Sequence, residues 1–204
     1  MSSVELDLRR LDPGENPRQG DVAAAAEADA LVVRGPVVAL NAVLAVLLKA
    51  GRSATVPVSW EPTGDKASAD LARELDIGTG SARDLTLVRD DHGGVLLHHG
   101  RVEAAGNGRR SLSRRIGLQA HHDDLKVADG EITRIDVRPE WQAVDTIGVT
   151  VMTLPLRPTQ RTSGRALQIA SDPARIVRDG VPFPRPVTRW TWYADERVRW
   201  RLQP

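Results

Sequence analysis

The sequence contains no cysteine, and this absence excludes several kinds of chemistry. Without a thiol, the chain cannot form a disulfide, use a thiolate nucleophile or bind zinc through cysteine ligands. Its first residues also lack the charged-then-apolar pattern of a signal peptide. We therefore expect a soluble protein of a reducing compartment, with a cytoplasmic location.

Aromatic residues are scarce, and charge of one sign is not in excess. Only 3% of the 204 residues are aromatic, whereas 41% are hydrophobic, so the core must be mainly aliphatic. Few rings remain to stack on bases. The 28 Lys and Arg against 27 Asp and Glu leave a formal net charge of +1, without the long-range field of a polyanion binder. Both features argue against nucleic acid as a partner.

The chain also lacks a long hydrophobic run. Its longest apolar stretch, Val37 to Leu48, is interrupted by Asn41 and falls short of the ~20 residues that span a bilayer. The densest basic cluster lies in segment 104–115, which reads as a solvated loop. The alternative is attraction to anionic lipid head groups, at roughly 1 kcal/mol per charge. We expect at most peripheral membrane contact.

The hydrophobic pattern changes character near residue 84. Before it, strand patterns at 4–8, 30–33 and 54–60 alternate with helical patterns at 22–28, 37–50 and 66–75. After it, only short strand patterns follow, at 85–88, 95–98, 125–127, 132–137, 147–154, 165–169, 175–177 and from 188 onward. Alternating strands and helices favour a parallel sheet with right-handed crossovers. The predicted fold class is α/β plus all-β: a truncated parallel α/β unit over 1–84, then a β-rich, sandwich-like domain over 85–204.

Local signals place several boundaries. Asp21 is a suitable N-cap for the alanine-rich stretch, and Gly51 a suitable C-cap for the second helix. The segments 90–94 and Asp129-Gly130 have the composition of turns, and Asp129-Gly130 is typical of a hairpin turn.

The terminal tryptophans add a prediction about packing. Trp190 and Trp192 are two residues apart, so on a strand their side chains share one face, which predicts packing in the core or between domains.

Four short segments follow one another in an order typical of a known family. They are Ala28 to Gly35, Leu40-Asn41, Asp70 to Leu75 and Arg175 to Gly180. They resemble, in turn, the strand before the GGDGT loop, the Leu-Asn of the next helix, the end of GTxNDxAR and the DGE turn of the diacylglycerol kinase catalytic family. The resemblance spans most of the chain. It implies a fold shared with NAD kinases and phosphorylation of a lipid hydroxyl that depends on ATP and Mg²⁺.

The resemblance also implies site residues. Asp70 and Asp179 occupy positions of acids near the phosphates or the metal ion. Gly35, Asn41 and Gly180 occupy positions beside the bound nucleotide.

The departures from the family motifs affect the same positions. Where the family has GGDGT, this chain has the run Gly35-Pro36-Val37-Val38-Ala39. Proline has no N–H for a phosphate, and β-branched valines disfavour positive φ. Lys66-Ala67-Ser68-Ala69 replaces Gly-Thr-x-Asn, and Val181 replaces the Glu of DGE. We interpret the chain as a divergent, truncated member: a weak or inactive kinase that binds lipid or nucleotide, with ATP and Mg²⁺ as implied cofactors or with none.

Two other functions remain open. One is a non-enzymatic regulatory protein that uses its β domain as an interface. The other is a metal-dependent hydrolase built on His98-His99 and His121-His122, with Asp123 or Asp124 as a further ligand. Neighbouring strand residues point to opposite faces, so each pair offers one ligand to a site, and solvated histidines are the ordinary interpretation. A truncated sheet has an exposed edge, which predicts a homodimer.

Overall fold

The computed structural model describes residues 2–12, 14–106, 114–154 and 157–204. Its strands are β1 (Ser3–Asp7), β2 (Ala30–Gly35), β3 (Pro57–Pro62), β4 (Arg83–Asp90), β5 (Val95–Leu96), β6 (Gly100–Ala104), β7 (Ile116–His122), β8 (Leu125–Ile132), β9 (Arg134–Pro139), β10 (Ile147–Leu154), β11 (Arg157–Gly164), β12 (Ala166–Arg178), β13 (Val181–Pro182) and β14 (Val187–Leu202). The helices are α1 (Gln19–Val22), the 3₁₀ turn η1 (Ala23–Ala26), α2 (Val37–Lys49) and α3 (Lys66–Glu74).

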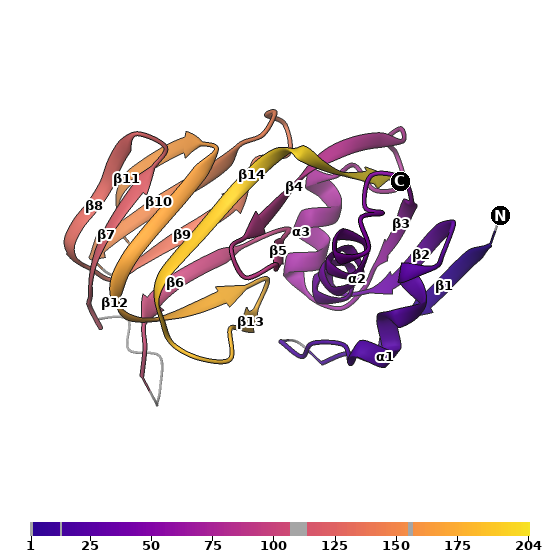
Figure 1. The fold of residues 1–204 in the computed structure, drawn as a ribbon, viewed down its shortest axis with the longest axis horizontal. Helices are drawn as coiled ribbons and strands as arrows, with labels where there is room; N and C mark the ends of the chain where they lie inside the picture. Colours follow the sequence, from indigo (N-terminus) through magenta and orange to yellow (C-terminus); the bar gives the residue numbers. More distant parts are fainter. Residues whose placement is uncertain (1, 13, 107–113, 155–156) are drawn as a thin grey trace.

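The first strands form the predicted parallel sheet. β1, β2 and β3 pair in parallel, with α2 between β2 and β3 in the chain. Figure 1 shows α2 and α3 beside these strands, at the end of the molecule that holds both termini. Helix α2 ends as its sequence predicts: Gly51 has φ +69°, its N–H donates to Leu48 O, and the Arg52 N–H donates to Leu47 O.

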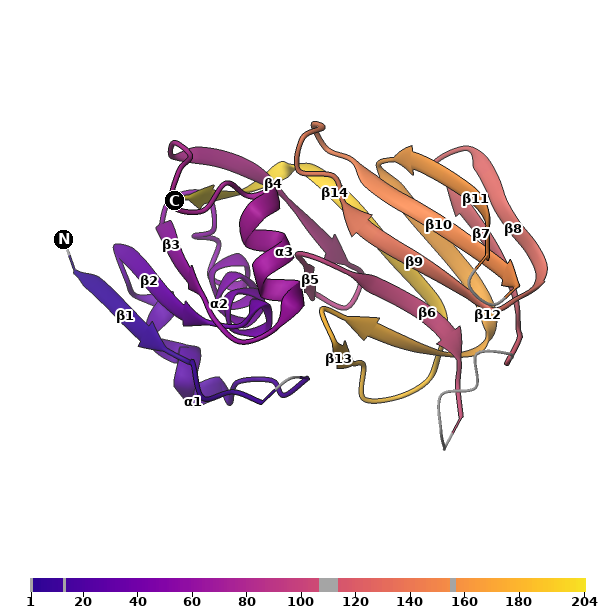
Figure 2. The ribbon, with the colours of Figure 1, turned by 180° about the vertical axis from the view of Figure 1, so that it is seen from behind.

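Strand β14 joins this end of the molecule to the β-rich remainder. Its first half pairs antiparallel with β12, its second half with β4, and its last two residues pair in parallel with β3. Figure 2 shows β14 running from the β-rich end towards the C-terminus. The result is one mixed, 14-stranded sheet, in which the longest path is β1-β2-β3-β14-β12-β6-β9-β10-β11. The order of an α/β part followed by a β-rich part is confirmed. Its division into two domains at residue 84 stays a prediction.

Two hydrophobic clusters lie along the sheet, both mainly aliphatic. The first includes the buried side chains of α2 together with Trp200 and Leu202 from the end of β14. The second contains Trp190 and Trp192, whose ring centroids lie 5.6 Å apart and whose side chains are fully buried. The predicted core packing of these two tryptophans is confirmed.

The alanine-rich stretch does not form the predicted helix over 22–28. Val22 is the last residue of the short α1, the alanines 23–26 form the 3₁₀ turn η1, and β2 begins at Ala30. Asp21 is not the N-cap: it lies within α1, and its carboxylate accepts a hydrogen bond from the backbone N–H of Arg18 at 3.0 Å.

The hairpin predicted at Asp129-Gly130 is wrong. Both residues lie inside β8, where Gly130 faces Leu118 of β7. The β7–β8 turn occurs at Asp123, which has φ +52°. Its carboxylate accepts backbone N–H bonds from Ala166 at 2.8 Å and Arg165 at 2.9 Å, which fixes the turn against the start of β12.

Segment 104–115 lies partly outside the described residues, including Arg109 and Arg110. Of its other arginines, Arg115 lies 3.6 Å from Glu131 in an exposed ion pair. Within the described ranges, no helix has the length and apolar character needed to cross a membrane.

Candidate functional site

The turn between β12 and β13 carries two of the predicted site residues. Asp179 and Gly180 form a two-residue hairpin loop, flanked by the paired residues Arg178 and Val181. Both loop residues have positive φ, +47° and +89°, as type I′ hairpin turns require. The presence of Asp and Gly at these two positions is therefore explained by the positive φ angles of the turn, without a ligand.

The Asp179 carboxylate is buried and fixes the loop between β5 and β6. It accepts backbone N–H bonds from Leu97 at 2.9 Å, His98 at 2.8 Å and His99 at 2.9 Å. The Asp179 N–H in turn donates to His99 O at 2.8 Å. A carboxylate bound to several N–H groups is a strong acceptor, so Asp179 acts here as a clamp between two loops.

Asn41 brings helix α2 to the same point. Its side-chain amide donates to Asp179 Oδ2 at 2.6 Å and to Val95 O at 2.7 Å. The structure thus unites Asn41 with Asp179, two residues that lie 138 positions apart. Their contact ties α2, the β5–β6 loop and the β12–β13 turn together.

The resemblance predicts a phosphate loop at the N-terminus of α2, and a side chain of α3 caps the helix there. The Val37 N–H donates to Ser68 Oγ at 2.9 Å, within the core. Ser68 Oγ donates in turn to Asp65 Oδ1 at 2.8 Å. Pro36, just before, has no N–H. One N–H that an anion could have used is thus bound to the protein's own hydroxyl.

Gly35 ends β2 at a place where backbones come close. A Cβ added there would lie 3.0 Å from Leu8 O and 3.1 Å from the Ala39 Cβ. Its carbonyl accepts from the Trp60 indole N–H at 3.0 Å and from the Thr63 N–H at 3.2 Å. These contacts give Gly35 a structural explanation that needs no ligand.

Asp70 lies on α3, away from this cluster of contacts. It forms ion pairs with Lys66 at 2.6 Å and Arg73 at 2.9 Å, on its own helix. The hydrogen bond from Lys66, and then that from Arg73, lower the pKa of Asp70. No contact found among the described residues joins Asp70 to Asp179.

Among the described residues, neither predicted histidine pair belongs to a cluster of possible metal ligands. The buried His98 ring has its pKa lowered, first by burial and then by the charge of Arg138, and the His122 Nδ1 lies 2.7 Å from Thr162 Oγ1. Over the described ranges, three ligand-type side chains meet within 4.8 Å only at Asp90, Asp91 and His92, a group without the predicted histidines. There the Asp90 carboxylate binds Arg178 at 2.8 Å and completes the β4–β5 turn.

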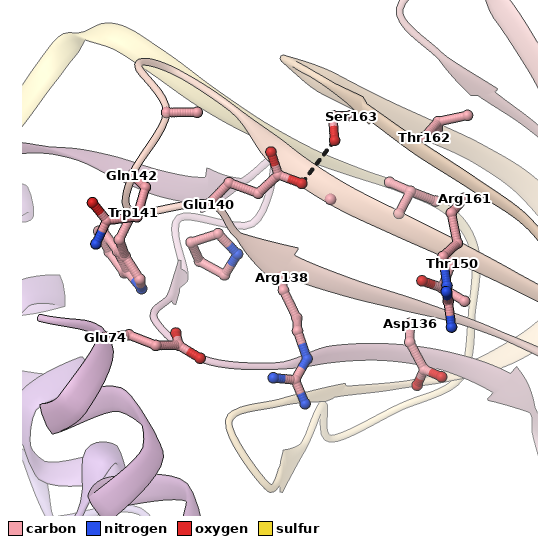
Figure 3. Close-up of a pocket in the computed structure, with 14 residues that line it drawn as sticks. Glu74, Asp136, Arg138, Glu140, Trp141, Gln142, Thr150, Arg161, Thr162 and Ser163 are labelled. Carbon is pink, nitrogen blue, oxygen red and sulfur yellow. Dashed lines mark hydrogen bonds between the residues drawn. The ribbon is translucent and has the colours of Figure 1, made fainter.

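A cavity of about 740 Å³ lies between α3 and the strands β9, β10 and β11. In Figure 3, Glu74 of α3 faces it from one side, and Arg138 points into the space between Glu74 and Asp136. Glu140 accepts a hydrogen bond from the Ser163 hydroxyl at 2.7 Å, drawn as a dashed line. The half-buried Trp141 supplies an aromatic wall.

A second, smaller cavity of about 430 Å³ shares part of this lining. At its floor, Asp136 contacts His99 at 3.0 Å, Arg101 at 3.2 Å and Arg134 at 2.8 Å. Burial raises the pKa of Asp136, but the hydrogen bond from His99 and the nearby arginines more than offset it and lower the pKa to about 2. Asp136 is therefore ionised at neutral pH.

The sequence patterns did not single out these cavity residues. One signal was present: Arg134, Asp136 and Arg138 alternate with the buried Ile135 and Val137. This alternation predicts a half-buried strand whose outward face is charged, but it does not show which other strands lie beside that face.

Comparison with known proteins shows the fold. No protein-family profile and no curated protein sequence matches the chain. Among solved structures, a diacylglycerol kinase from Bacillus anthracis is similar with a TM-score of 0.67 at 11% identity, over 92% of this chain and 83% of that one. An NAD kinase from Archaeoglobus fulgidus in complex with ATP has a TM-score of 0.60 at 13% identity, over 93% and 82%. A yeast NADH kinase complexed with NADH gives 0.56 at 13%, over 92% and 64%. The predicted resemblance is confirmed at the level of the fold.

Proposed function

We propose that this chain is a diacylglycerol-kinase-like protein that binds a nucleotide or a lipid phosphate and transfers phosphoryl groups weakly or not at all. One observation carries the proposal: protein groups occupy the positions that the resemblance assigns to phosphate and catalysis. The Val37 N–H is bound to Ser68, and the Asp179 carboxylate to three backbone N–H groups and Asn41.

Phosphoryl transfer depends mainly on positioning and charge stabilisation, by loops and metal ions together. A ligand phosphate at the α2 N-terminus would have to displace Ser68 from Val37. A base or metal role for Asp179 would have to break hydrogen bonds that hold two loops. Both changes cost folding free energy, since a buried N–H left without an acceptor costs about 1–3 kcal/mol.

The residues also fit Mg²⁺ poorly. The two acids that the resemblance offers have their oxygens engaged, Asp70 by Lys66 and Arg73, and Asp179 by four N–H donors. A hard cation prefers several free carboxylate oxygens. We therefore expect ligand binding that does not require Mg²⁺.

A nucleotide is the first ligand to test, because two proteins of similar fold were solved with ATP or NADH. A lipid phosphate is the second, because of the resemblance to diacylglycerol kinases. The 740 Å³ cavity is large enough for the organic part of either ligand.

Two assays together test the proposal. With dioctanoylglycerol, radiolabelled ATP and Mg²⁺, we expect lipid phosphorylation no greater than in a reaction without protein. With ATP, ADP or short-chain phosphatidic acid, we expect the melting temperature to rise, because ligands of the folded state stabilise it. If the wild-type protein phosphorylates dioctanoylglycerol and the Asp179→Asn variant does not, the proposed loss of catalysis is wrong. Unchanged melting with all three compounds would overturn the binding role.

The assembly of the chain is a separate proposal. β1 lies at one end of the longest strand path, and an uncovered edge strand is a site for pairing. A homodimer formed through this edge gives twice the chain mass in light scattering, and a monomer at micromolar concentration contradicts it.

A further inference from the structure

A row of side chains crosses four strands at the β-rich end of the molecule. Arg101 of β6 is the cross-strand partner of Asp136 on β9, Asp136 pairs with Thr150 of β10, and Thr150 with Arg161 of β11. Directly paired residues on neighbouring strands project to the same face of a sheet. This register therefore brings two arginines to one face, on either side of Asp136 and Thr150.

The groove in this face follows from the small residues of β10. Opposite Arg138 that strand has Gly148, and opposite Asp136 it has Thr150. Long side chains of β9 and β11 thus stand on either side of a strand with short ones. The 430 Å³ cavity lies here, lined by the arginines 101, 134, 138 and 161, which with Asp136 we call the arginine groove.

The groove has an excess of positive charge, whereas several arginines elsewhere in the sheet are neutralised by a carboxylate. Arg89 and Arg175, for example, each have a carboxylate of their own, Asp195 and Glu103. The groove has four arginines and one carboxylate, Asp136, which forms ion pairs with two of them, Arg101 and Arg134. Like charges gathered at one place destabilise a sheet unless something neutralises them.

Two guanidinium groups are left to bind a ligand. In the part of the chain that the structure describes, Arg138 and Arg161 have no carboxylate within 4.0 Å, although both line the groove. In Figure 3, Arg161 of β11 extends towards Asp136, and Arg138 of β9 points into the space between Glu74 and Asp136. Asp136 meanwhile holds Arg101 and Arg134 in place and is engaged with His99, so it stabilises the groove without neutralising it.

We propose that the arginine groove binds a phosphomonoester, with Arg138 and Arg161 contacting its oxygens. The planar guanidinium fork matches phosphate oxygens in pairs, and two such groups suit a dianion. The organic part would extend into the adjoining 740 Å³ cavity, where the carboxylates of Glu74 and Glu140 can accept bonds from sugar or glycerol hydroxyls. This inference rests on the proposed function for its ligand class, and it adds a binding site whose residues lie outside the family motifs.

The experiment measures binding by calorimetry with three probes: inorganic phosphate, AMP and dihexanoyl phosphatidic acid below its micellar concentration. We expect the wild-type chain to bind at least one probe, and adenosine and dihexanoylglycerol to bind at least about tenfold more weakly, because they lack the phosphate. Preference for AMP identifies a nucleotide site, and preference for phosphatidic acid a lipid-phosphate site. Either preference supports a site that recognises phosphate, and the variants below test whether that site is the groove. Wild-type protein that binds none of the three probes overturns it.

Matched double variants locate the site. Arg138→Gln with Arg161→Gln should weaken binding by at least about tenfold. Arg185→Gln with Arg189→Gln removes the same charge from exposed positions outside both cavities and should leave affinity within about twofold, since such charges are screened by salt. Equal affinity in the groove variant and the wild type would overturn the inference.

The two proposals fail in different ways. Lipid kinase turnover would overturn the proposed loss of catalysis and leave phosphate binding in the groove intact. If the groove variant binds a nucleotide as tightly as the wild type does, the groove is not the binding site. The proposed function would then still stand. An unchanged melting temperature of the unliganded groove variant shows that any loss of binding is not a loss of folding.

Discussion

At the scale of single residues, Asp179 has two structural roles, one through its backbone and one through its carboxylate. Its positive φ shapes the β12–β13 turn, and its oxygens hold the β5–β6 loop and Asn41. Asparagine keeps the first role, because it tolerates the left-handed region. It loses the second, because an amide NH₂ replaces one acceptor and faces N–H donors.

We therefore expect Asp179→Asn to lower the free energy of unfolding by about 2–3 kcal/mol. Urea denaturation measures this loss. Asp76→Asn is the control, since Asp76 also has a positive φ, +51°, but is exposed. It should change stability by no more than about 0.5 kcal/mol. Equal effects of the two substitutions would show that the Asp179 carboxylate does not hold the loops.

Asp136 gives a prediction about pH. Its folded-state pKa of about 2 lies below the ordinary value of 3.8, so the folded protein prefers its charged form. That contribution is complete above about pH 5, declines as pH falls through about 4 and disappears below about 2; it amounts to about 2 kcal/mol. Asp136→Asn lacks this dependence. Urea unfolding between about pH 2.5 and 6 should show the wild-type advantage over the variant shrinking as pH falls. If the free energy of unfolding depends on pH in the same way in both proteins, the ion pairs of Asp136 do not stabilise the fold.

At the scale of elements, the contact between α2 and α3 depends on Ser68. Replacing it by alanine leaves the buried Val37 N–H without an acceptor, so Ser68→Ala should cost about 1–2 kcal/mol of stability. Amide hydrogen exchange at Val37 should become faster. The matched control is Ser81→Ala, at an exposed position, with an expected effect within about 0.5 kcal/mol. Slow exchange at Val37 in the Ser68→Ala protein would mean that another group caps α2.

Elements with their own periodic pattern could be predicted from the sequence. The aliphatic run followed by Gly51 located α2, and the apolar residues of 147–154 located β10. By contrast, β11 has hardly any apolar residue, and it is a strand because its backbone pairs with β10. The β7–β8 turn was missed for a similar reason: the Asp123 side chain stabilises it by accepting a hydrogen bond from the backbone of Arg165, which lies 42 residues later.

The candidate site shows the same limit. The turn at Asp179 could be predicted from its Asp-Gly dipeptide, and the motif order brought Asn41 into consideration. Their hydrogen bond could not be predicted, because it joins residues 138 positions apart. The arginine groove depends on the register of four strands, and a shift of one residue would turn its side chains to the other face.

At the scale of the whole molecule, β14 couples the two ends. It contributes Trp192 to the second hydrophobic cluster and Trp200 to the first, and the described helices all lie at the first end. A packing defect in the second cluster should therefore also lower the melting temperature of the helices, because both ends share one continuous sheet. We expect a single cooperative unfolding transition.

Trp192→Phe tests this coupling. The smaller ring leaves a cavity in the fully buried second cluster and should cost about 1–3 kcal/mol, or several degrees in melting temperature. The far-ultraviolet helix signal reports the first end and near-ultraviolet dichroism reports the tryptophans, and both should shift by the same amount. Tyr193→Phe, the next residue on β14, removes only a hydroxyl from a half-buried ring and should leave both signals near their wild-type midpoints. A helix signal that melts at the wild-type temperature in Trp192→Phe would mean that the two ends unfold separately, as independent domains do.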